Sequence, residues 1–128
     1  MAQVKSVTVG LPVADLGQAV EWYRRLLGTV KEIQPAPGVW EFQITPTTWL
    51  QLFDGEPVRS SEGKTAIVRF ESDHIEASWE LVAGLSTEVG EIETVPGVVR
   101  YFEFCDPFGN RLSYYQILEP SGNGVTRG

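Results

Sequence analysis

The sequence contains one cysteine, Cys105, and one histidine, His74, among its 128 residues. A single thiol cannot form an internal disulfide or a thiolate metal cluster, which excludes a disulfide-stapled secreted fold and a zinc ribbon. We therefore expect a reduced compartment, the cytoplasm. A lone histidine cannot supply a three-histidine metal site, and we expect His74 to face solvent in the first turn of a helix.

Long hydrophobic runs and an excess of basic residues are also missing. No apolar run approaches the roughly 18 to 20 residues that a membrane span needs. Ten basic residues against seventeen acidic ones give a net charge of −7, which opposes binding to a phosphate backbone. We expect neither nucleic acid nor a membrane as a partner, whereas the negative charge favours a cationic small molecule.

The chain has the composition of a globular protein. The hydrophobic fraction is 42%, with four tryptophans, four tyrosines and six phenylalanines, so disorder is excluded. The length fits a single domain over residues 1–128. Within it we expect a first module at about 4–53, a connector at 54–64, a second module at about 65–118 and a loose tail at 119–128.

The first module is predicted to contain one helix and four strands. Alternating valines and leucines predict a strand over 4–13, which Pro12 places at a sheet edge or strand end. Asp15 is predicted to cap the following helix and Gly28 to end it. Three further strands are expected at 29–33, 39–44 and 48–53.

The second module repeats this pattern. A strand is expected at 65–71, and Asp73 with Glu76 forms a second capping box before a helix. Further strands are predicted at 87–94, 98–105 and 111–118. A single shift along the sequence aligns both Asp15 with Asp73 and Ala19 with Ala77. This indicates two copies of a βαβββ module.

The predicted fold class is α+β. One helix covers only one face of its sheet, so two modules are expected to form a curved mixed sheet around an open cleft, with the helices on the outer face. Binding sites occur preferentially in such clefts.

Two stretches carry a resemblance to a known family. They are VGLPVADLGQAVEWYRRLLG at 9–28 and FEFCDPFGNRLSYYQ at 102–116. In the second, Asp106-Pro107-Phe108-Gly109-Asn110 is also a strong turn sequence. The chain resembles the vicinal oxygen chelate superfamily, which includes the glyoxalase, bleomycin-resistance and extradiol dioxygenase proteins. The resemblance implies paired modules, within one chain or exchanged between chains, and a homodimer.

The resemblance also implies where a metal would bind. Enzymes of the superfamily place four ligands, His, Glu or Gln, on strands one, four, five and eight. The matching positions here hold Thr8, Gln51, Thr65 or a neighbour, and Ser113. These groups lack the imidazoles and carboxylates that iron, zinc or nickel need, so we predict no bound metal and no cofactor.

The side chains expected near the cleft are aromatic with a few polar groups, which suits a flat or amphipathic organic ligand. We treat Arg69 and Arg111 as binding a ligand anion or pairing with a carboxylate such as Glu71 or Glu103. Cys105 is expected to fill space in a strand. The candidate ligand-binding residues are Thr8, Trp40, Trp49, Gln51, Phe53, Arg69, Glu103, Arg111, Ser113 and Tyr115.

These residues favour a metal-free protein that binds an aromatic or cationic organic compound. The alternative is a metal-dependent lyase, isomerase or dioxygenase of the same superfamily with non-standard ligands. A third hypothesis is an interaction protein whose cleft residues form the interface of its homodimer.

Overall fold

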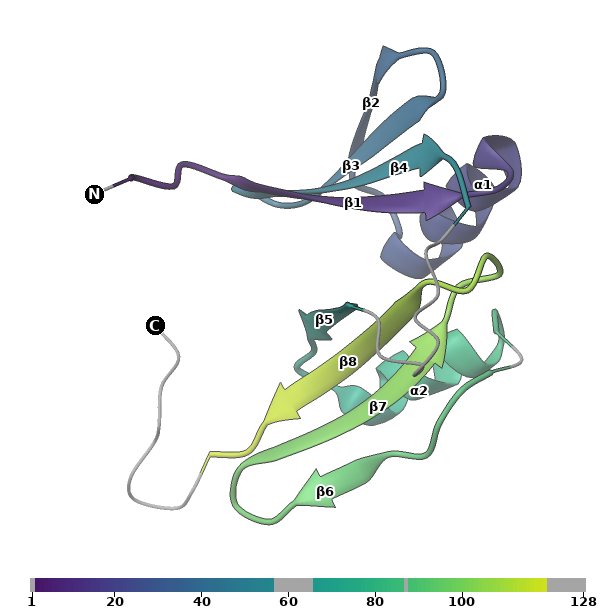
Figure 1. Cartoon of the computed structure of the whole chain (residues 1–128). Helices are drawn as coiled ribbons and strands as arrows, with labels where there is room; N and C mark the ends of the chain where they lie inside the picture. Colours follow the sequence, from purple (N-terminus) through teal and green to yellow (C-terminus); the bar gives the residue numbers. More distant parts are fainter. Residues whose placement is uncertain (1, 57–65, 87, 120–128) are drawn as a thin grey trace. The chain divides into compact units, whose positions relative to one another are not determined.

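A computed structural model describes residues 2–56, 66–86 and 88–119, which form two compact units. The first unit contains the described residues up to 56 together with 107–110, and the second contains the others. The elements of the first unit are β1 (Val7–Val13), α1 (Leu16–Leu27), β2 (Lys31–Ala36), β3 (Val39–Thr45) and β4 (Thr48–Asp54) (Figure 1). Those of the second are β5 (Ile67–Glu71), α2 (Ile75–Ala83), β6 (Glu93–Val95), β7 (Val99–Cys105) and β8 (Arg111–Ile117).

Each unit forms its own four-stranded mixed sheet. The strand order is β1-β4-β3-β2 in the first unit and β5-β8-β7-β6 in the second. In both, the first strand pairs parallel with the last and the other pairs are antiparallel. The α+β class and the two βαβββ modules are confirmed. The predicted edge position of Pro12 is also confirmed, because β1 lies at the edge of its sheet.

Helix α1 begins and ends where its local sequence predicts. Asp15 is the N-cap, and its Oδ1 accepts a hydrogen bond of 3.0 Å from the amide N of Gln18. Gly28 ends the helix with a φ of 74° and donates its N–H to the carbonyl of Arg24. A positive φ strains residues that carry a Cβ, which explains glycine at this position.

The start of helix α2 differs from the prediction. The N-cap is His74 rather than Asp73, and its side chain makes no capping hydrogen bond. Instead, Oε1 of Gln116 in β8 accepts a hydrogen bond of 3.0 Å from the amide N of Ile75. A side chain distant in sequence thus satisfies an amide at the helix start. His74 therefore precedes the helix and does not lie in its first turn.

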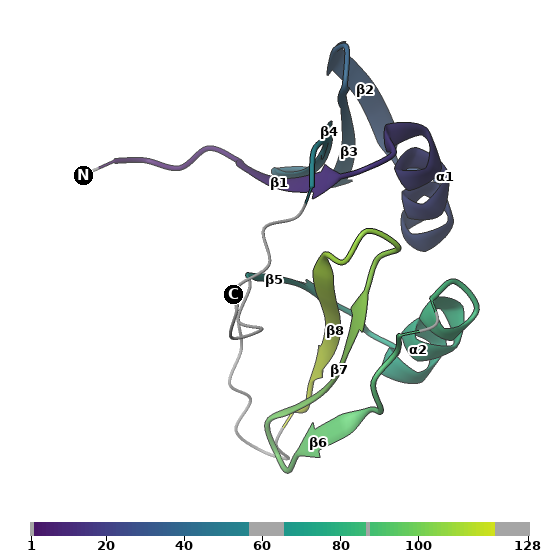
Figure 2. The same cartoon turned by 45° about the vertical axis from the view of Figure 1, so that its right-hand side comes forward.

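Each helix packs on one face of its own sheet (Figure 2). Under α1 the sheet contributes Val13, Phe42, Leu50 and Leu52, all fully buried. Tyr23 of α1 lies above Phe42, with ring centroids 6.4 Å apart.

The core under α2 is an aromatic cluster around Tyr114. Its ring centroid lies 5.3 Å from that of Phe70 and 5.8 Å from those of Phe102 and Phe104. Burial raises the pKa of Tyr114 to about 12, because a phenolate loses its hydration in apolar surroundings. Leu112 of the same strand is fully buried.

The predicted strand at 87–94 is largely absent from the described part of that range, 88–94. Only β6 at Glu93–Val95 pairs fully, preceded by an isolated bridge between Val89 and Phe104. The amide N of Gly90 donates to the carbonyl of Glu103 at 2.8 Å, and its carbonyl accepts from Nε1 of Trp79 at 2.9 Å. The Trp79 indole therefore hydrogen-bonds to a carbonyl that would accept a bond from the neighbouring strand if the strand were longer.

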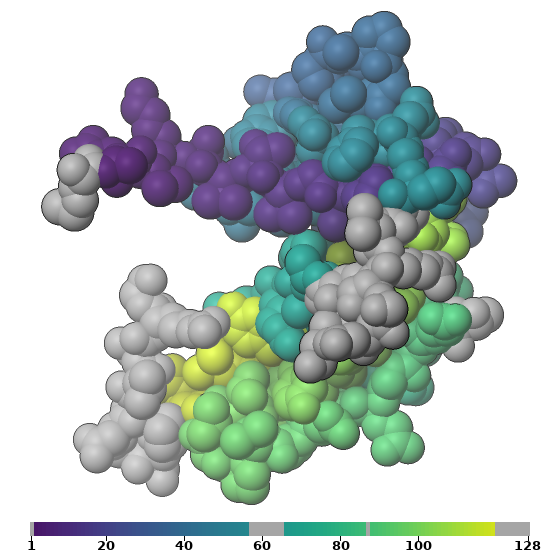
Figure 3. Space-filling model, in the orientation of Figure 1, coloured from purple at the N-terminus to yellow at the C-terminus, as the bar shows by residue number. Residues whose placement is uncertain are grey.

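The predicted turn at Asp106–Asn110 is confirmed. Gly109 adopts a φ of 91°. Asn110, which belongs to the first unit, donates from Nδ2 to the carbonyl oxygen of Pro12 at 2.8 Å. Residues 2–6 before β1 are exposed and extend beyond the sheet (Figure 3). Neither α1 nor α2 has the length and apolar character needed to cross a bilayer, and the part of the chain that the structure describes holds no other helix that does.

Candidate functional site

Strand alternation places every second side chain of each sheet on the face opposite its helix, which we call the helix-free face. In the first unit this face carries Thr8, Gly10, Lys31, Glu41, Gln43, Trp49, Gln51 and Phe53. In the second unit it carries Ile67, Arg69, Glu71, Tyr101, Glu103, Cys105, Arg111, Ser113 and Tyr115. All the predicted site residues except Trp40 lie on one of these two faces.

The centre of the helix-free face in the first unit is a row of three paired residues, Gly10, Gln51 and Glu41. Nε2 of Gln51 donates to Oε2 of Glu41 at 2.7 Å. Among the residues that the structure describes, Glu41 forms no ion pair. Within the described residues, the row therefore presents a half-buried carboxylate bonded to a neutral amide and to no cation.

Two aromatic rings flank this row. A Cβ added to Gly10 would lie 3.2 Å from Cε1 of Phe53 and 3.6 Å from Oε1 of Gln51. The Phe53 ring therefore lies against the bare backbone of β1. Trp49 lies in the neighbouring row, where Nζ of Lys31 is 5.8 Å from the centroid of the Trp49 ring. Such a contact between an ammonium and an indole is a cation–π interaction.

The corresponding row in the second unit is Arg69, Ser113 and Glu103. Nη2 of Arg69 lies 3.3 Å from Oε2 of Glu103, and Nη2 of Arg111 lies 3.4 Å from Oε1. Both arginines thus pair with one carboxylate, as one of our two readings of them predicted, and Glu103 is that partner. The ion pairs are partly exposed and contribute modestly to stability.

Ser113 is fully buried within this row. Its Oγ accepts a hydrogen bond from Nη1 of Arg69 at 3.2 Å and donates to the carbonyl of Tyr114 at 3.4 Å. The hydroxyl is therefore engaged within the protein, which leaves it poorly placed to contact a ligand or ion directly.

Tyrosines occupy the next row of the second unit, where Tyr115 pairs with Tyr101 and Glu71. A hydrogen bond to Glu93 raises the pKa of Tyr101, because it stabilises the neutral phenol. Burial raises the pKa of the Cys105 thiol. A raised pKa keeps Cys105 protonated at neutral pH, which does not favour a nucleophilic role.

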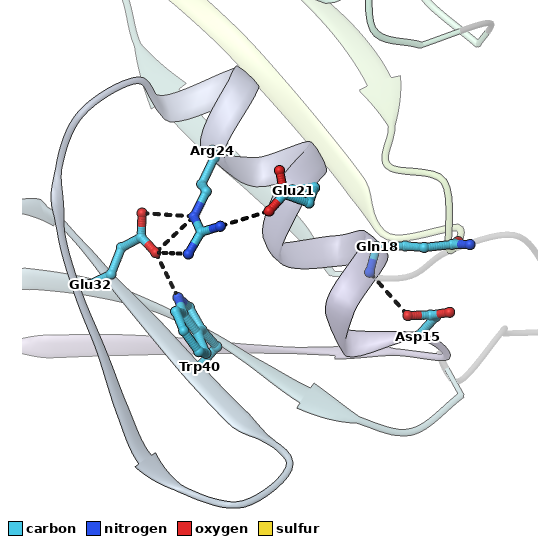
Figure 4. Close-up of polar contacts among 6 residues, drawn as sticks. All are labelled: Asp15, Gln18, Glu21, Arg24, Glu32 and Trp40. Atoms are coloured by element: carbon cyan, nitrogen blue, oxygen red, sulfur yellow. Dashed lines mark hydrogen bonds and ion pairs between the residues drawn. The ribbon is translucent and has the colours of Figure 1, made fainter.

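Trp40 lies apart from the other predicted site residues. Its Nε1 donates to Oε1 of Glu32 at 3.0 Å, and its ring lies beneath the guanidinium of Arg24, 5.5 Å from the centroid (Figure 4). Trp40 pairs with Leu52, so it belongs to the face covered by α1. Trp40 therefore forms a contact between helix and sheet and does not share the helix-free face with the other predicted residues.

Sequence reasoning missed two charged residues of the first unit. Glu41 and Lys31 both lie on the helix-free face, beside Gln51 and Trp49 respectively. For Glu41 a signal existed, because it lies between Trp40 and Phe42 and must point to the opposite face from both. Lys31 is the first residue of β2 and gave no comparable signal.

The donor set at the predicted metal positions does not fit a transition metal. Thr8 and Gln51 offer a hydroxyl and an amide, and the Ser113 hydroxyl is already engaged. Thr65, the remaining position considered, lies outside the described residues. Over 2–56, 66–86 and 88–119, no group of three or more His, Cys, Asp or Glu side chains is arranged to hold an ion. Divalent transition metals need imidazole, thiolate or carboxylate ligands.

Solved structures with the same fold are numerous. A glyoxalase/bleomycin resistance protein/dioxygenase from Nocardioides is 21% identical, with a TM-score of 0.72, and the match covers 100% of this chain and 91% of that one. TnmS3, an antibiotic binding protein from a Streptomyces species, is 20% identical, with a TM-score of 0.68 and coverage of 91% and 97%. FosX, a fosfomycin resistance protein from Listeria monocytogenes complexed with Mn(II), is 16% identical, with a TM-score of 0.69 and coverage of 91% and 90%.

No curated protein matches the sequence. The family described as the Glyoxalase/Bleomycin resistance protein/Dioxygenase superfamily matches residues 5–114, which is most of the chain. The two βαβββ units agree with that match, and the chain belongs to this superfamily.

Proposed function

We propose that this protein binds a small organic molecule, aromatic or cationic, without the help of a metal ion. The observation that carries the proposal is the chemistry of the helix-free face in the first unit. There Trp49 and Phe53 offer aromatic surface, and Gln51 and Glu41 offer polar groups beside them. Aromatic surface with a few oriented polar groups is typical of small-molecule sites.

The donor set supports the metal-free part of the proposal. By the resemblance, Thr8, Gln51 and Ser113 match the positions where enzymes of the superfamily hold ions, and none of them is a histidine or a carboxylate. The relatives include both classes of protein, since TnmS3 is named as antibiotic binding and FosX was solved with Mn(II). The residues of this chain favour the first class.

The ligand-binding residues that we propose are Thr8, Trp49, Gln51 and Phe53 on the first unit and Arg69, Glu103, Arg111 and Tyr115 on the second. Binding is expected by stacking on the rings and by hydrogen bonds to Gln51 and the charged groups. A homodimer in the cytoplasm stays a prediction, and light scattering after gel filtration tests the dimer.

Intrinsic tryptophan fluorescence tests the binding function. We expect a panel of aromatic natural products and aromatic cations to contain compounds that quench the fluorescence saturably, and Trp49→Phe to remove most of that quenching. Trp79→Phe is the matched control, since Nε1 of Trp79 is bonded to the Gly90 carbonyl away from the helix-free face. A panel without a saturable response would contradict the proposal.

Elemental analysis of protein purified without chelator tests the metal-free part. We expect far less than one equivalent of iron, nickel, zinc or manganese per chain. About one equivalent, retained through dialysis, would favour the alternative of a metal-dependent lyase, isomerase or dioxygenase.

A further inference from the structure

The central rows of the two sheets occupy equivalent positions in the repeated module. Gly10 and Arg69 lie the same number of residues before their helices, which begin at Leu16 and Ile75. Gly10 pairs with Gln51 as Arg69 pairs with Ser113. Glu41 and Glu103 then pair with these residues in the same antiparallel register. Gly10 therefore corresponds to Arg69, and Glu41 corresponds to Glu103.

The two rows differ in one charged group. In the second unit, the guanidinium of Arg69 lies 3.3 Å from the carboxylate of Glu103. In the first unit, Gly10 has no side chain to do the same for Glu41. The structure describes no other ion pair to Glu41 within the ranges it covers. The row in the first unit thus has a carboxylate, Glu41, equivalent to Glu103, but no side chain equivalent to the cation of Arg69.

The space above Gly10 is lined by hydrogen-bond acceptors. Because Nε2 of Gln51 donates to Glu41, the other end of the amide, Oε1, is turned toward Gly10, 3.6 Å from where a Cβ would lie. The carboxylate of Glu41 adds further acceptor oxygens. The edge of the Phe53 ring lies closer, at 3.2 Å, so the ring shifts slightly when a group enters this space. Acceptors beside an aromatic ring match a donor that carries positive charge.

We propose, on the basis of the proposed function, that the ligand carries an aromatic ring joined to a cationic N–H group, an amidinium or a protonated amine. This cationic group lies in the space above Gly10. There the group takes the place that the Arg69 guanidinium holds in the repeat. It pairs with Glu41 and donates to Oε1 of Gln51, while the ligand ring lies against Phe53 and Trp49.

Lys31 also lies on this face and carries a positive charge, so it competes with such a ligand. Its ammonium already lies over the Trp49 ring, in the row next to Glu41. Replacing it with alanine frees the indole face and removes a like charge. Lys31→Ala is therefore expected to tighten binding of an aromatic cation severalfold, whereas it would weaken binding of an anion.

The test compares three probes of nearly equal shape and different charge: benzamidine, benzamide and benzoate. Titration of the ¹⁵N-labelled full-length protein follows the side-chain N–H signals of Gln51 and Trp49 by NMR. We expect benzamidine to shift both signals saturably, with an affinity at least fivefold higher than that of benzamide or benzoate. An equal or stronger response to benzamide or benzoate would overturn the cation assignment and leave the binding function standing.

Substitutions then locate the cation. Glu41→Gln is expected to lower benzamidine affinity at least fivefold. Glu80→Gln, which removes the same charge from an exposed position of α2, is expected to leave that affinity unchanged. Equal affinities of the two variants would overturn the inference, as would the absence of any benzamidine response in the unsubstituted protein. The fluorescence panel decides the binding function independently.

The most direct test introduces at position 10 the arginine that the second module has at the equivalent position 69. Gly10 does not have a positive φ, so a side chain is allowed there, and its nearest neighbour is the movable ring of Phe53. Gly10→Arg is expected to pair with Glu41 and lower benzamidine affinity at least tenfold. Gly10→Ala, whose Cβ would press on the Phe53 ring without adding a charge, is expected to lower it by much less than Gly10→Arg does. Similar affinities of the two variants would contradict occupation of this space by the ligand.

Discussion

Nε of Arg24 in helix α1 lies 3.0 Å from Oε1 of Glu32 in strand β2, and the same carboxylate accepts a hydrogen bond from Trp40. The guanidinium also reaches Glu21 at 2.7 Å, one turn earlier on the helix (Figure 4). The helix is thus tied to the outer edge strand of its sheet by a charged group that rests on an aromatic ring. The same arrangement removes Trp40 from the helix-free face.

This tie predicts a pH dependence of stability. The Arg24 guanidinium lowers the pKa of Glu32 below its ordinary value of 4.5. A lowered folded-state pKa contributes stability that is complete above the unfolded value and is lost as the pH falls through the folded value. The difference in free energy of unfolding between the unsubstituted protein and Glu32→Gln should therefore shrink as the pH falls below about 4.5. Urea unfolding between about pH 3 and pH 6 measures it, and a constant difference would contradict the tie.

The two helix starts predict unequal effects of the same substitution. Asp15→Ala removes the hydrogen bond to the amide of Gln18 and should cost about 1 kcal/mol in free energy of unfolding. Asp73→Ala lies one residue before the true N-cap of α2 and should change stability by less than about 0.5 kcal/mol. Urea unfolding of both variants checks this. Equal losses would mean that Asp73 caps α2 after all.

Alanine substitutions at two glycines are expected to change stability in opposite directions. Gly38 has a φ of 79°, and a Cβ there would lie 2.9 Å from Oδ2 of Asp54, so Gly38→Ala should destabilise the protein by about 1 to 2 kcal/mol. Gly17 is exposed in α1, where a Cβ would meet only Oδ1 of Asp15 at 3.6 Å. Gly17→Ala should stabilise the protein by up to about 1 kcal/mol. Thermal or urea unfolding measures the change in stability of each variant. A Gly38→Ala variant as stable as the unsubstituted protein would contradict a strained turn at this position.

Tyr114 predicts an ionisation at unusually high pH. Since burial raises its pKa to about 12, the neutral phenol stabilises the folded state fully below the ordinary value of 10.0, and this contribution is lost as the pH rises toward 12. In a spectrophotometric titration of the tyrosines, Tyr114→Phe should remove the last step and leave the earlier ones. Loss of a step near pH 10 instead would show that the hydroxyl is hydrated.

The sequence predicted those features of the fold that depend on neighbouring residues, and missed those that depend on residues distant along the chain. Helix α1 was predicted at its observed ends because Asp15 and Gly28 act on their immediate neighbours. Helix α2 begins at Ile75 because Gln116, far along the chain, accepts a hydrogen bond from its first amide. Such a partner becomes visible only when β8 is placed beside the helix. The short β6 has a similar cause, since Trp79 binds the Gly90 carbonyl.

The candidate site shows the same division. Alternation correctly placed Trp49, Gln51 and Phe53 together, because a strand of known parity fixes the face of each residue. The neighbouring strand β3 was ambiguous, and its pairing of Trp40 with Leu52 settles the face. With that parity known, alternation places Glu41 beside Gln51 on the helix-free face.

The parallel pairing of β1 with β4, and of β5 with β8, makes the two modules independent of each other in their sheet hydrogen bonding. Each module completes the hydrogen bonding of its sheet with its own strands. A side chain on the exposed ladder of one module can therefore differ from its counterpart without disturbing the backbone framework of the other. Arg69 in the second module and Gly10 in the first differ in this way at equivalent positions, so that a repeated backbone carries an internal ion pair in one copy and offers an unneutralised carboxylate to a cation in the other.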